Sequence, residues 1–359
     1  MNSIEIGRHR LTNQQIIGNE FKEPVEVVAW LGAVQAQEYA LSKWSIGFRL
    51  ADATDQMIEA AFNRGEILRT HLLRPTWHFV TQEDIRWMLT LTAPRVNGIN
   101  AFMYRKMELD QPLFTRANNE IIKALRNGKQ LTRSQLQTVL ERKKIIASGV
   151  RLSCIMMQAE LDGIICSGPR LANQFTYALL EEWVPPVKKL TAEEALAKLT
   201  SRYFNSRGPA TLKDYVTWSG LTVAQARHGL ELVNGDFIME KSGEDTHYFP
   251  AGLLTVKPVK KAFLLPPYDE YIMGYKNRDD IFYARNKAKS KPATLFDNMI
   301  IYDGQVVGSW RRSIQARSVM LEYHLWDENK AVQAAVKSSI NQFAVFVNLP
   351  VIKKKHGDN

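Results

Sequence analysis

Apolar and polar positions along the chain follow one order three times: two or three short helical patterns, then two strand-like runs joined by a tight turn. In the first copy, which spans residues 8–80, the hairpin bends at Arg74-Pro75. A long amphipathic helix at about 82–107 follows this copy. The predicted elements of the first copy are helices at 24–36, 42–50 and 54–63 and strands at 67–72 and 76–80.

The same order returns in a second copy at 115–188 and a third at 191–250. Thr132 is placed to cap the helix after it, and Thr191 with Glu194 forms a capping-box pattern. The predicted elements of the second copy are helices at 118–126, 133–140 and 151–163 and strands at 164–166 and 174–179. Those of the third copy are helices at 195–203, 209–218 and 222–232 and strands at 237–240 and 247–250.

Three helices followed by a hairpin are the plan of a winged helix, a variant of the helix-turn-helix motif. From about residue 260 the pattern changes to short β-rich runs, with a hairpin signal at Asp303-Gly304 and a closing helix at 328–341. The predicted fold class is α+β, with three tandem winged-helix modules followed by a small β-rich C-terminal domain. The predicted domains are winged helix 1 with its following helix at 8–110, winged helix 2 at 111–188, winged helix 3 at 189–255 and the C-terminal domain at 256–352.

Composition narrows the class of protein further. No apolar run in the 359 residues approaches the ~18–20 needed to span a bilayer, and the N-terminus has no signal-peptide core. We therefore expect a cytoplasmic protein without a membrane partner. The two cysteines, Cys154 and Cys166, are too few for a disulfide framework or a zinc knuckle. The net charge of +10 suits a polyanionic partner such as nucleic acid.

The most informative candidate site is Gln35-Ala36-Gln37, two amides one residue apart in an apolar segment. Side chains two apart point about 200° away from each other on a helix, whereas they share a face on extended backbone. The two glutamines can therefore converge only where the helix at 24–36 is ending. A cap or surface role for the pair stays open on spacing alone.

Polar residues on the first hairpin could support such a site. Arg74, Thr76 and His78 alternate and so share one strand face, as do Arg69 and His71. They could line a pocket or bind phosphates, or they could be the ordinary polar positions of a half-buried wing. A metal site at His71 and His78 is disfavoured, because no carboxylate or cysteine completes it at the usual spacing.

Further candidates flank the glutamines or lie on predicted recognition helices. Tyr39 and Trp44 could stack on a base or wedge into a duplex, or they could belong to the core. Asp269 is the alternative residue for positioning a water molecule. No phosphate-loop, dinucleotide-binding, zinc-protease or serine-hydrolase motif occurs, and we expect no cofactor and no metal. The candidate DNA-binding residues on recognition helices, each of which could instead form surface salt bridges, are Arg133, Lys213 and Arg227.

Five stretches carry a family resemblance: 35–37 with Trp44, 73–80, 208–215 with Trp218 and Gly220, 264–270 with Gly274, Tyr275 and Arg278, and 303–312. In these the chain resembles, over nearly its whole length, the bacterial AlkZ-like winged-helix DNA glycosylases, which carry a Gln-hydrophobic-Gln motif. The resemblance implies that Gln35 and Gln37 are catalytic. A sister branch has an acidic residue at the second position, and this chain does not match it. The implied reaction releases a purine alkylated at N7 from double-stranded DNA, with bulky adducts and crosslinks as candidate substrates.

Glutamine does not titrate near neutral pH, so it cannot act as a general acid. A purine alkylated at N7 is already cationic and leaves as a neutral base without protonation. What remains is to place a water molecule below C1′ and to stabilise an oxocarbenium-like sugar, and amide dipoles can do both. The competing function is that of a non-enzymatic DNA-binding protein, either a regulator or an architectural factor. Regulators of this kind usually dimerise on palindromic DNA, and no heptad-like segment is evident, so we expect a monomeric enzyme.

Overall fold

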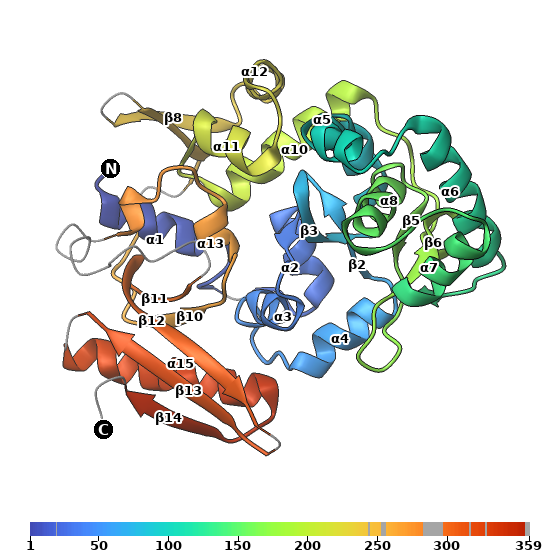
Figure 1. Ribbon diagram of the computed structural model, residues 1–359. Coiled ribbons are helices and arrows are strands. Elements are labelled where there is room, and N and C mark those ends of the chain that lie inside the picture. Colours follow the sequence, from blue (N-terminus) through green and yellow to red (C-terminus); the bar gives the residue numbers. More distant parts are fainter. Residues whose placement is uncertain are drawn as a thin grey trace.

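The computed structural model describes residues 1–18, 20–242, 245–252, 256–282, 297–315, 317–326 and 329–355. In this part of the chain, three helical units each carry a three-stranded sheet, and a C-terminal unit is built on a five-stranded sheet. Figure 1 shows the second unit, in green, and the C-terminal unit, in orange and red, on opposite sides of the blue helices of the first unit. No helix among these residues has the length and apolar content to cross a membrane.

The first unit (residues 24–81) follows a helix, α1 (Ser3–Asn13), that we did not predict. Asn2 and Glu5 form a capping box at the start of α1, and this spacing is a signal that the sequence contains. The strands of the unit pair in the antiparallel order β1-β3-β2. Its elements are α2 (Pro24–Leu31), β1 (Val34–Gln35), α3 (Tyr39–Gly47), α4 (Asp55–Asn63), β2 (Ile67–Leu72) and β3 (Arg74–Thr81), and α5 (Ile85–Lys106) follows.

The helix predicted at 24–36 ends five residues early, at Leu31. Gly32 follows with a φ of 77°, in the region that favours glycine, and a Cβ at this position would lie 2.9 Å from the Arg202 side chain. Val34 and Gln35 then form a short edge strand on β3. The prediction for this segment was wrong because pairing with β3 outweighs the local helical pattern of apolar residues.

The second unit (111–179) and the third unit (192–250) repeat this arrangement, with sheet orders β4-β6-β5 and β7-β9-β8. The predicted caps at Thr132 and Thr191 are confirmed, each within a complete capping box. The helix predicted at 209–218 begins only after β7, because Thr211 caps α11. The elements are α6 (Gln111–Leu125), β4 (Leu131–Thr132), α7 (Arg133–Arg142), α8 (Gly149–Leu161), β5 (Ile165–Ser167), β6 (Thr176–Leu179), α9 (Leu180–Trp183), α10 (Ala192–Arg207), β7 (Ala210–Thr211), α11 (Leu212–Ser219), α12 (Val223–Leu232), β8 (Phe237–Ser242) and β9 (Asp245–Pro250).

The C-terminal unit (262–355) places one sheet, in the order β10-β11-β12-β13-β14, against a long helix. The predicted hairpin turn at Asp303 and Gly304 joins β11 to β12, with φ angles of 52° and 78°. β14 returns through α15 to pair in parallel with β13. The elements are β10 (Ala262–Leu265), α13 (Glu270–Met273), η1 (Asp279–Ile281), β11 (Asn298–Tyr302), β12 (Gln305–Ile314), β13 (Val319–Leu325), α15 (Lys330–Val347) and β14 (Val351–Lys355).

Buried apolar side chains of the described chain form three cores, and two of them join different units. One core unites α2, α3 and α4 with the five-stranded sheet and α15, and another unites the first and third units through α5. Ala33 belongs to the second of these cores, whereas Val34 and Ala36 belong to the first. The segment that carries the two glutamines therefore lies at the junction of both shared cores.

Candidate active site

Gln35 lies on extended backbone at the end of β1 rather than at a helix end, and Gln37 lies in the bend that follows. Gln35 in β1 is directly opposite His78 in β3, and the Ala36 N–H donates to the Trp77 carbonyl at 2.7 Å, which continues the pairing. Ala36 separates the two glutamines, and its side chain belongs to the core that unites α2, α3 and α4 with the five-stranded sheet. Ala36 is fully buried. Its small side chain thus anchors the segment to the core between the two amides.

Gln35 is held rigidly, with only 3% of its surface exposed. Its backbone N–H donates to Glu270 Oε1 at 2.9 Å, and its side-chain Oε1 accepts a hydrogen bond from Arg74 Nη2 at 3.1 Å. Arginine can only donate hydrogen bonds, so the amide oxygen must face Arg74 and the NH₂ group must face away. The Gln35 NH₂ group makes no hydrogen bond within the described structure.

Arg74 connects Gln35 to the third unit. Its guanidinium donates to the carbonyls of Thr217 and Trp218 at the C-terminal end of α11, where the helix dipole favours a cation. Gly220 allows this close approach, because a Cβ there would lie 2.2 Å from the Leu73 carbonyl oxygen. Burial lowers the pKa of Arg74, although a guanidinium stays charged at any physiological pH.

His78 completes this polar face as a neutral imidazole. It is fully buried, and its Nδ1 lies 2.9 Å from the Thr76 carbonyl oxygen, an acceptor, so Nδ1 carries the proton. Nε2 faces Arg74 Nη2 at 3.5 Å and accepts. Burial, and then the positive charge of Arg74, lower the pKa of His78 well below its ordinary value.

A buried ion pair fixes the backbone before Gln35. Arg207 Nη2 lies 2.6 Å from Glu270 Oε2, both side chains are fully buried, and Trp218 Nε1 donates to the same carboxylate at 2.9 Å. Arg207 also donates to the carbonyls of Leu31 and Ala33. Sequence reasoning assigned no such role to this pair. Glu270 lies in one of the stretches behind the family resemblance, whereas no local pattern marks Arg207.

The structure does not support the alternative role of Asp269 in positioning water. Asp269 is fully buried, and its two oxygens accept from the Arg49 guanidinium at 2.8 and 2.9 Å. Ser45 Oγ donates to the same carboxylate, and the Tyr271 N–H is capped by it. Asp269 is therefore an internal structural group without access to a substrate.

Gln37 contrasts with Gln35 because its side chain is exposed and forms no hydrogen bond with a described residue. The backbone around it is nevertheless fixed, since Arg69 Nε donates to the Ala36 carbonyl at 3.0 Å. The next helix, α3, begins at Tyr39, and its N-cap residue Glu38 makes no side-chain capping bond. The amide of Gln37 is thus free to contact a substrate.

Arg74, Thr76 and His78 share the face of the sheet that carries Gln35, as the alternation predicts. Arg69 and His71 share the opposite face, which is turned to the second unit. His71 is 5% exposed, and its Nδ1 lies 2.5 Å from Glu160. The hypothesis that His71 or His78 contacts DNA directly is not supported, because burial removes both from the surface.

The aromatic candidates pack internally. Trp44 is 2% exposed, packs edge to face on Phe343 and donates its indole N–H to the Leu264 carbonyl, which fits the core alternative and does not support a contact with DNA. Tyr39 is half-buried, with its hydroxyl 3.0 Å from Glu59 and its ring against Phe175. Both residues support the backbone beside the glutamines.

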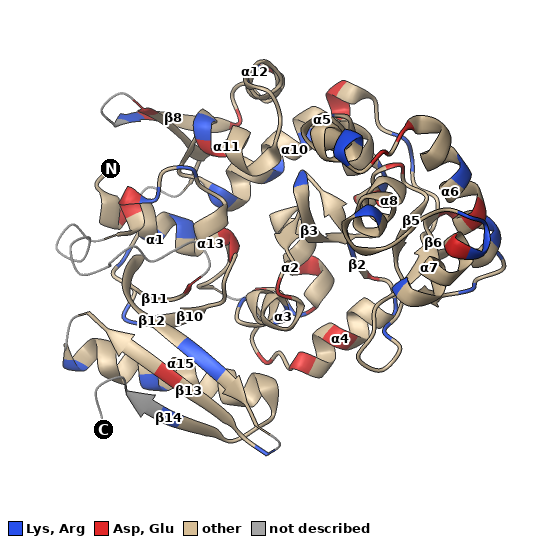
Figure 2. Ribbon diagram, in the orientation of Figure 1, with Lys and Arg blue, Asp and Glu red and all other residues tan. Residues whose placement is uncertain are grey.

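The remaining basic candidates lie on the second and third units. Arg133 is half-buried and donates to Ser153 Oγ at 2.8 Å, whereas Lys213 is exposed and pairs with Asp245 at 3.0 Å. Arg227 is exposed on α12. Figure 2 shows lysine and arginine on helices of the second, third and C-terminal units. Direct DNA contact by these three residues stays a prediction.

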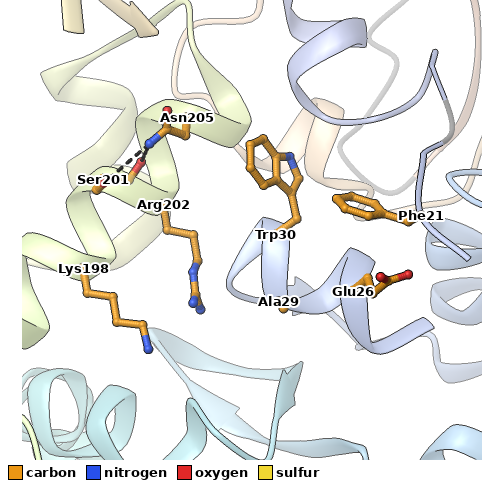
Figure 3. Close-up of a pocket in the computed structure, with 8 residues that line it drawn as sticks. All are labelled: Phe21, Glu26, Ala29, Trp30, Lys198, Ser201, Arg202 and Asn205. Atoms are coloured by element: carbon orange, nitrogen blue, oxygen red, sulfur yellow. Dashed lines mark hydrogen bonds between the residues drawn. The ribbon is translucent and has the colours of Figure 1, made fainter. Parts of the chain in front are cut away.

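The glutamines do not line either of two prominent cavities. One, of about 500 Å³, lies between α2 and α10, with Trp30 and Phe21 across from Lys198 and Arg202 (Figure 3). Both of these cations pair with Asp84. The other, of about 1000 Å³, lies between α5 and the segment that leads into α10. Among the described residues, no group of three or more His, Cys, Asp or Glu is arranged to hold a metal ion.

Comparisons with known proteins agree on one family. The family model described as DNA glycosylase AlkZ-like matches residues 28–346. Among solved structures, the chain is similar to the Streptomyces sahachiroi DNA glycosylase AlkZ, with 19% identity and a TM-score of 0.81 over 99% of this chain and 100% of that one. This likeness shows a shared mixed α+β fold. The search of curated proteins gives no match.

Proposed function

The chain belongs to the AlkZ-like DNA glycosylase family, and from this premise we propose that it hydrolyses the N-glycosidic bond of purines alkylated at N7, with Gln35 and Gln37 as catalytic residues. The enzyme class, DNA repair and DNA as the partner follow from the family. One observation carries the choice of residues. Gln35 and Gln37 flank the buried Ala36 in one short segment, one amide fixed by Arg74 and the other exposed.

The hydrogen bond from Arg74 to Gln35 supports different roles for the two amides. Because the Gln35 oxygen is taken by Arg74, this residue presents its NH₂ group. Gln37 can turn either end of its amide toward the substrate, so its carbonyl is the group that holds the attacking water. In this arrangement Gln35 donates to that water or to a sugar oxygen and fixes its position below C1′.

Two glutamine amides suit a substrate whose departing base does not have to be protonated by a general acid. As the N9–C1′ bond of an N7-alkylated purine breaks, its electron pair returns to the ring and neutralises the cation. Water adds to the oxocarbenium carbon and releases its proton to solvent, leaving an abasic site. His78 is neutral, so it adds no positive charge next to the cationic sugar.

The three units with three-stranded sheets are best interpreted as winged helices, followed by a β-rich domain that contributes to the core behind α3. In the third unit, Lys213 and Arg227 are exposed on α11 and α12 and are candidates for phosphate contacts. We expect a monomer to act on duplex DNA. The open position of Gln37 is compatible with bulky N7 adducts and with crosslinks, which would not fit an enclosed pocket.

The test is a comparison of two lesions in otherwise identical duplexes, one with N7-methylguanine and one with uracil. Abasic sites are converted to strand breaks by alkali and counted. We expect efficient breaks for N7-methylguanine and few for uracil, since uracil leaves as an anion and needs stabilisation that two amides do not supply. Comparable release of both bases would refute the proposal, and the absence of both would favour a DNA-binding protein without this activity.

A further inference from the structure

Arg69 forms the contact closest to Gln37 along the backbone. Its Nε–H donates to the Ala36 carbonyl at 3.0 Å, and that carbonyl belongs to the peptide group that leads into Gln37. The Arg69 backbone N–H is held in turn by Ser167 Oγ of the second unit at 2.7 Å. The backbone of Ala36, between the two glutamines, therefore donates its N–H to Trp77 in β3 and accepts at its carbonyl from Arg69 in β2.

Two aromatic rings hold the Arg69 guanidinium in place. Its Cζ lies 4.2 Å from the centroid of Trp77, on the same sheet, and 4.7 Å from the centroid of Phe175. Phe175 comes from the loop between β5 and β6, which is the wing of the second unit. This wing thus reaches the first unit beside the glutamine segment.

The same wing also contacts the start of α3, just after the glutamines. Arg170 lies 4.3 Å from the Phe175 centroid and 4.9 Å from that of Tyr39, and the Tyr39 and Phe175 rings meet edge to face at 4.9 Å. Both ends of the segment around Gln37 are consequently held by one loop.

An ordinary ion pair does not explain the position of Arg69. It forms no salt bridge with a carboxylate in the described ranges, and burial lowers its pKa to about 10. A buried guanidinium costs free energy unless its hydrogen bonds and stacking contacts offset the lost hydration. The hydrogen bond that Arg69 makes with the glutamine segment is the one to the Ala36 carbonyl. This contact points to a role for Arg69 in fixing the backbone geometry of that segment.

We propose that Arg69 is a positioning residue for Gln37, held between Trp77 and Phe175 so that the wing of the second unit sets the orientation of the catalytic peptide. The inference rests on the proposed function, since it takes Gln37 as catalytic. It differs from the expectation that Arg69 binds DNA phosphate. A phosphate contact changes affinity and its salt dependence, whereas a positioning contact changes the rate at saturating DNA.

The experiment measures single-turnover excision of N7-methylguanine at saturating DNA, together with the dissociation constant at several salt concentrations. For Arg69→Met and Phe175→Leu we expect the rate to fall on the order of 10- to 100-fold with nearly unchanged affinity. Arg69→Lys keeps the charge but loses the planar stack, so it should remain slow. The matched control is Arg64→Lys, at an exposed arginine paired with Glu66 on the same unit. Full activity in Arg69→Lys, or weaker binding with a smaller salt slope in Arg69→Met, would overturn the proposal.

A double-mutant cycle separates positioning of Gln37 from general damage. In a Gln37→Ala background, Arg69→Met should have almost no further effect on the rate, because the group that it positions is gone. An additive loss would contradict the inference. Hydrogen exchange of the Ala36 amide, which donates to the Trp77 carbonyl, gives a readout that is independent of activity. It should quicken in Arg69→Met and Phe175→Leu but not in Arg64→Lys, and unchanged exchange would refute the role even if the chosen lesion proved not to be a substrate.

Discussion

The corner between strand and helix, by which we mean the passage from β1 to α3, from β4 to α7 and from β7 to α11, is built differently in the first unit than in the other two. In the second and third units a two-residue strand ends in a threonine, Thr132 or Thr211, that caps the next helix in a complete capping box. Gln35 occupies the corresponding place, paired with the last strand of its sheet in the same way. It caps nothing, and α3 starts only at Tyr39 without a side-chain cap.

The three units differ in where the stabilisation of this segment comes from. A threonine cap contributes about 0.5–2 kcal/mol from within the segment itself. The first unit lacks that contribution. Its corner is held by Arg69 and Arg74 of its own hairpin and by Arg207 and Glu270 from the third and C-terminal units. Departures from local rules of this kind are expected at functional sites, where the surroundings supply the missing stabilisation.

The largest expected effect comes from removing the external support. In Glu270→Ala, the Arg207 guanidinium stays buried without its partner and the Gln35 N–H loses its acceptor. We expect a loss of about 3–5 kcal/mol in the free energy of unfolding, measured by urea denaturation. The control is Glu66→Ala, which breaks an exposed pair with Arg64 and should cost less than about 1 kcal/mol. Equal losses in the two variants would mean that the corner does not depend on Glu270.

The second effect concerns rate rather than stability. Gln37→Ala removes an exposed amide, so the free energy of unfolding should change by less than about 0.5 kcal/mol. Its single-turnover rate on N7-methylguanine should fall on the order of 100-fold, as for the loss of one preorganised polar group. DNA affinity should stay close to that of the unaltered protein. A variant that retained most of its rate would exclude Gln37 from the mechanism.

The sequence pattern predicts much of this architecture but not the details of the corner. Capping boxes at Thr132 and Thr191 and the turn at Asp303 are local signals, and the structure contains all three. Gln35 was expected at a helix end, because its pairing with His78 depends on a strand more than 40 residues away in sequence.

Burial was the other property that local patterns could not supply. Trp44, His71 and His78 carry polar or stacking groups typical of DNA contacts, yet all three are buried by elements distant in sequence. The hydrogen bond from Arg74 to Gln35 likewise forms only once the hairpin packs on the third unit. Residue types therefore indicate the chemistry, and tertiary packing decides which of these groups are exposed.

Removing the threonine caps of the other two units should lower stability without changing the excision rate, which is the opposite of what we expect for Gln37→Ala. Thr211→Ala and Thr132→Ala each remove a side-chain acceptor at a helix start, and we expect each to lose about 1 kcal/mol of stability. At a temperature where the folded protein predominates, single-turnover excision should be unchanged. Thermal unfolding and the excision assay together test this. A rate loss as large as that of Gln37→Ala would mean that the three corners are not functionally distinct.

The smallest expected effect is a pH dependence of the free energy of unfolding that arises from His78 in the sheet of the first unit. His78 has a folded-state pKa well below the unfolded value, because burial and Arg74 disfavour the imidazolium. The unfolded chain therefore binds the extra proton, and stability is present above the unfolded pKa of about 6.5 and lost as pH falls below it. Between pH 7 and pH 6 this group should cost about 0.7 kcal/mol. His9 and His247 have lowered pKa values for the same main reason, burial, so the measurement is the difference between the unaltered protein and His78→Asn in urea denaturation at each pH. A difference that does not vary with pH would show that folding leaves the pKa of His78 unchanged, and the imidazole would then not be held neutral beside Arg74.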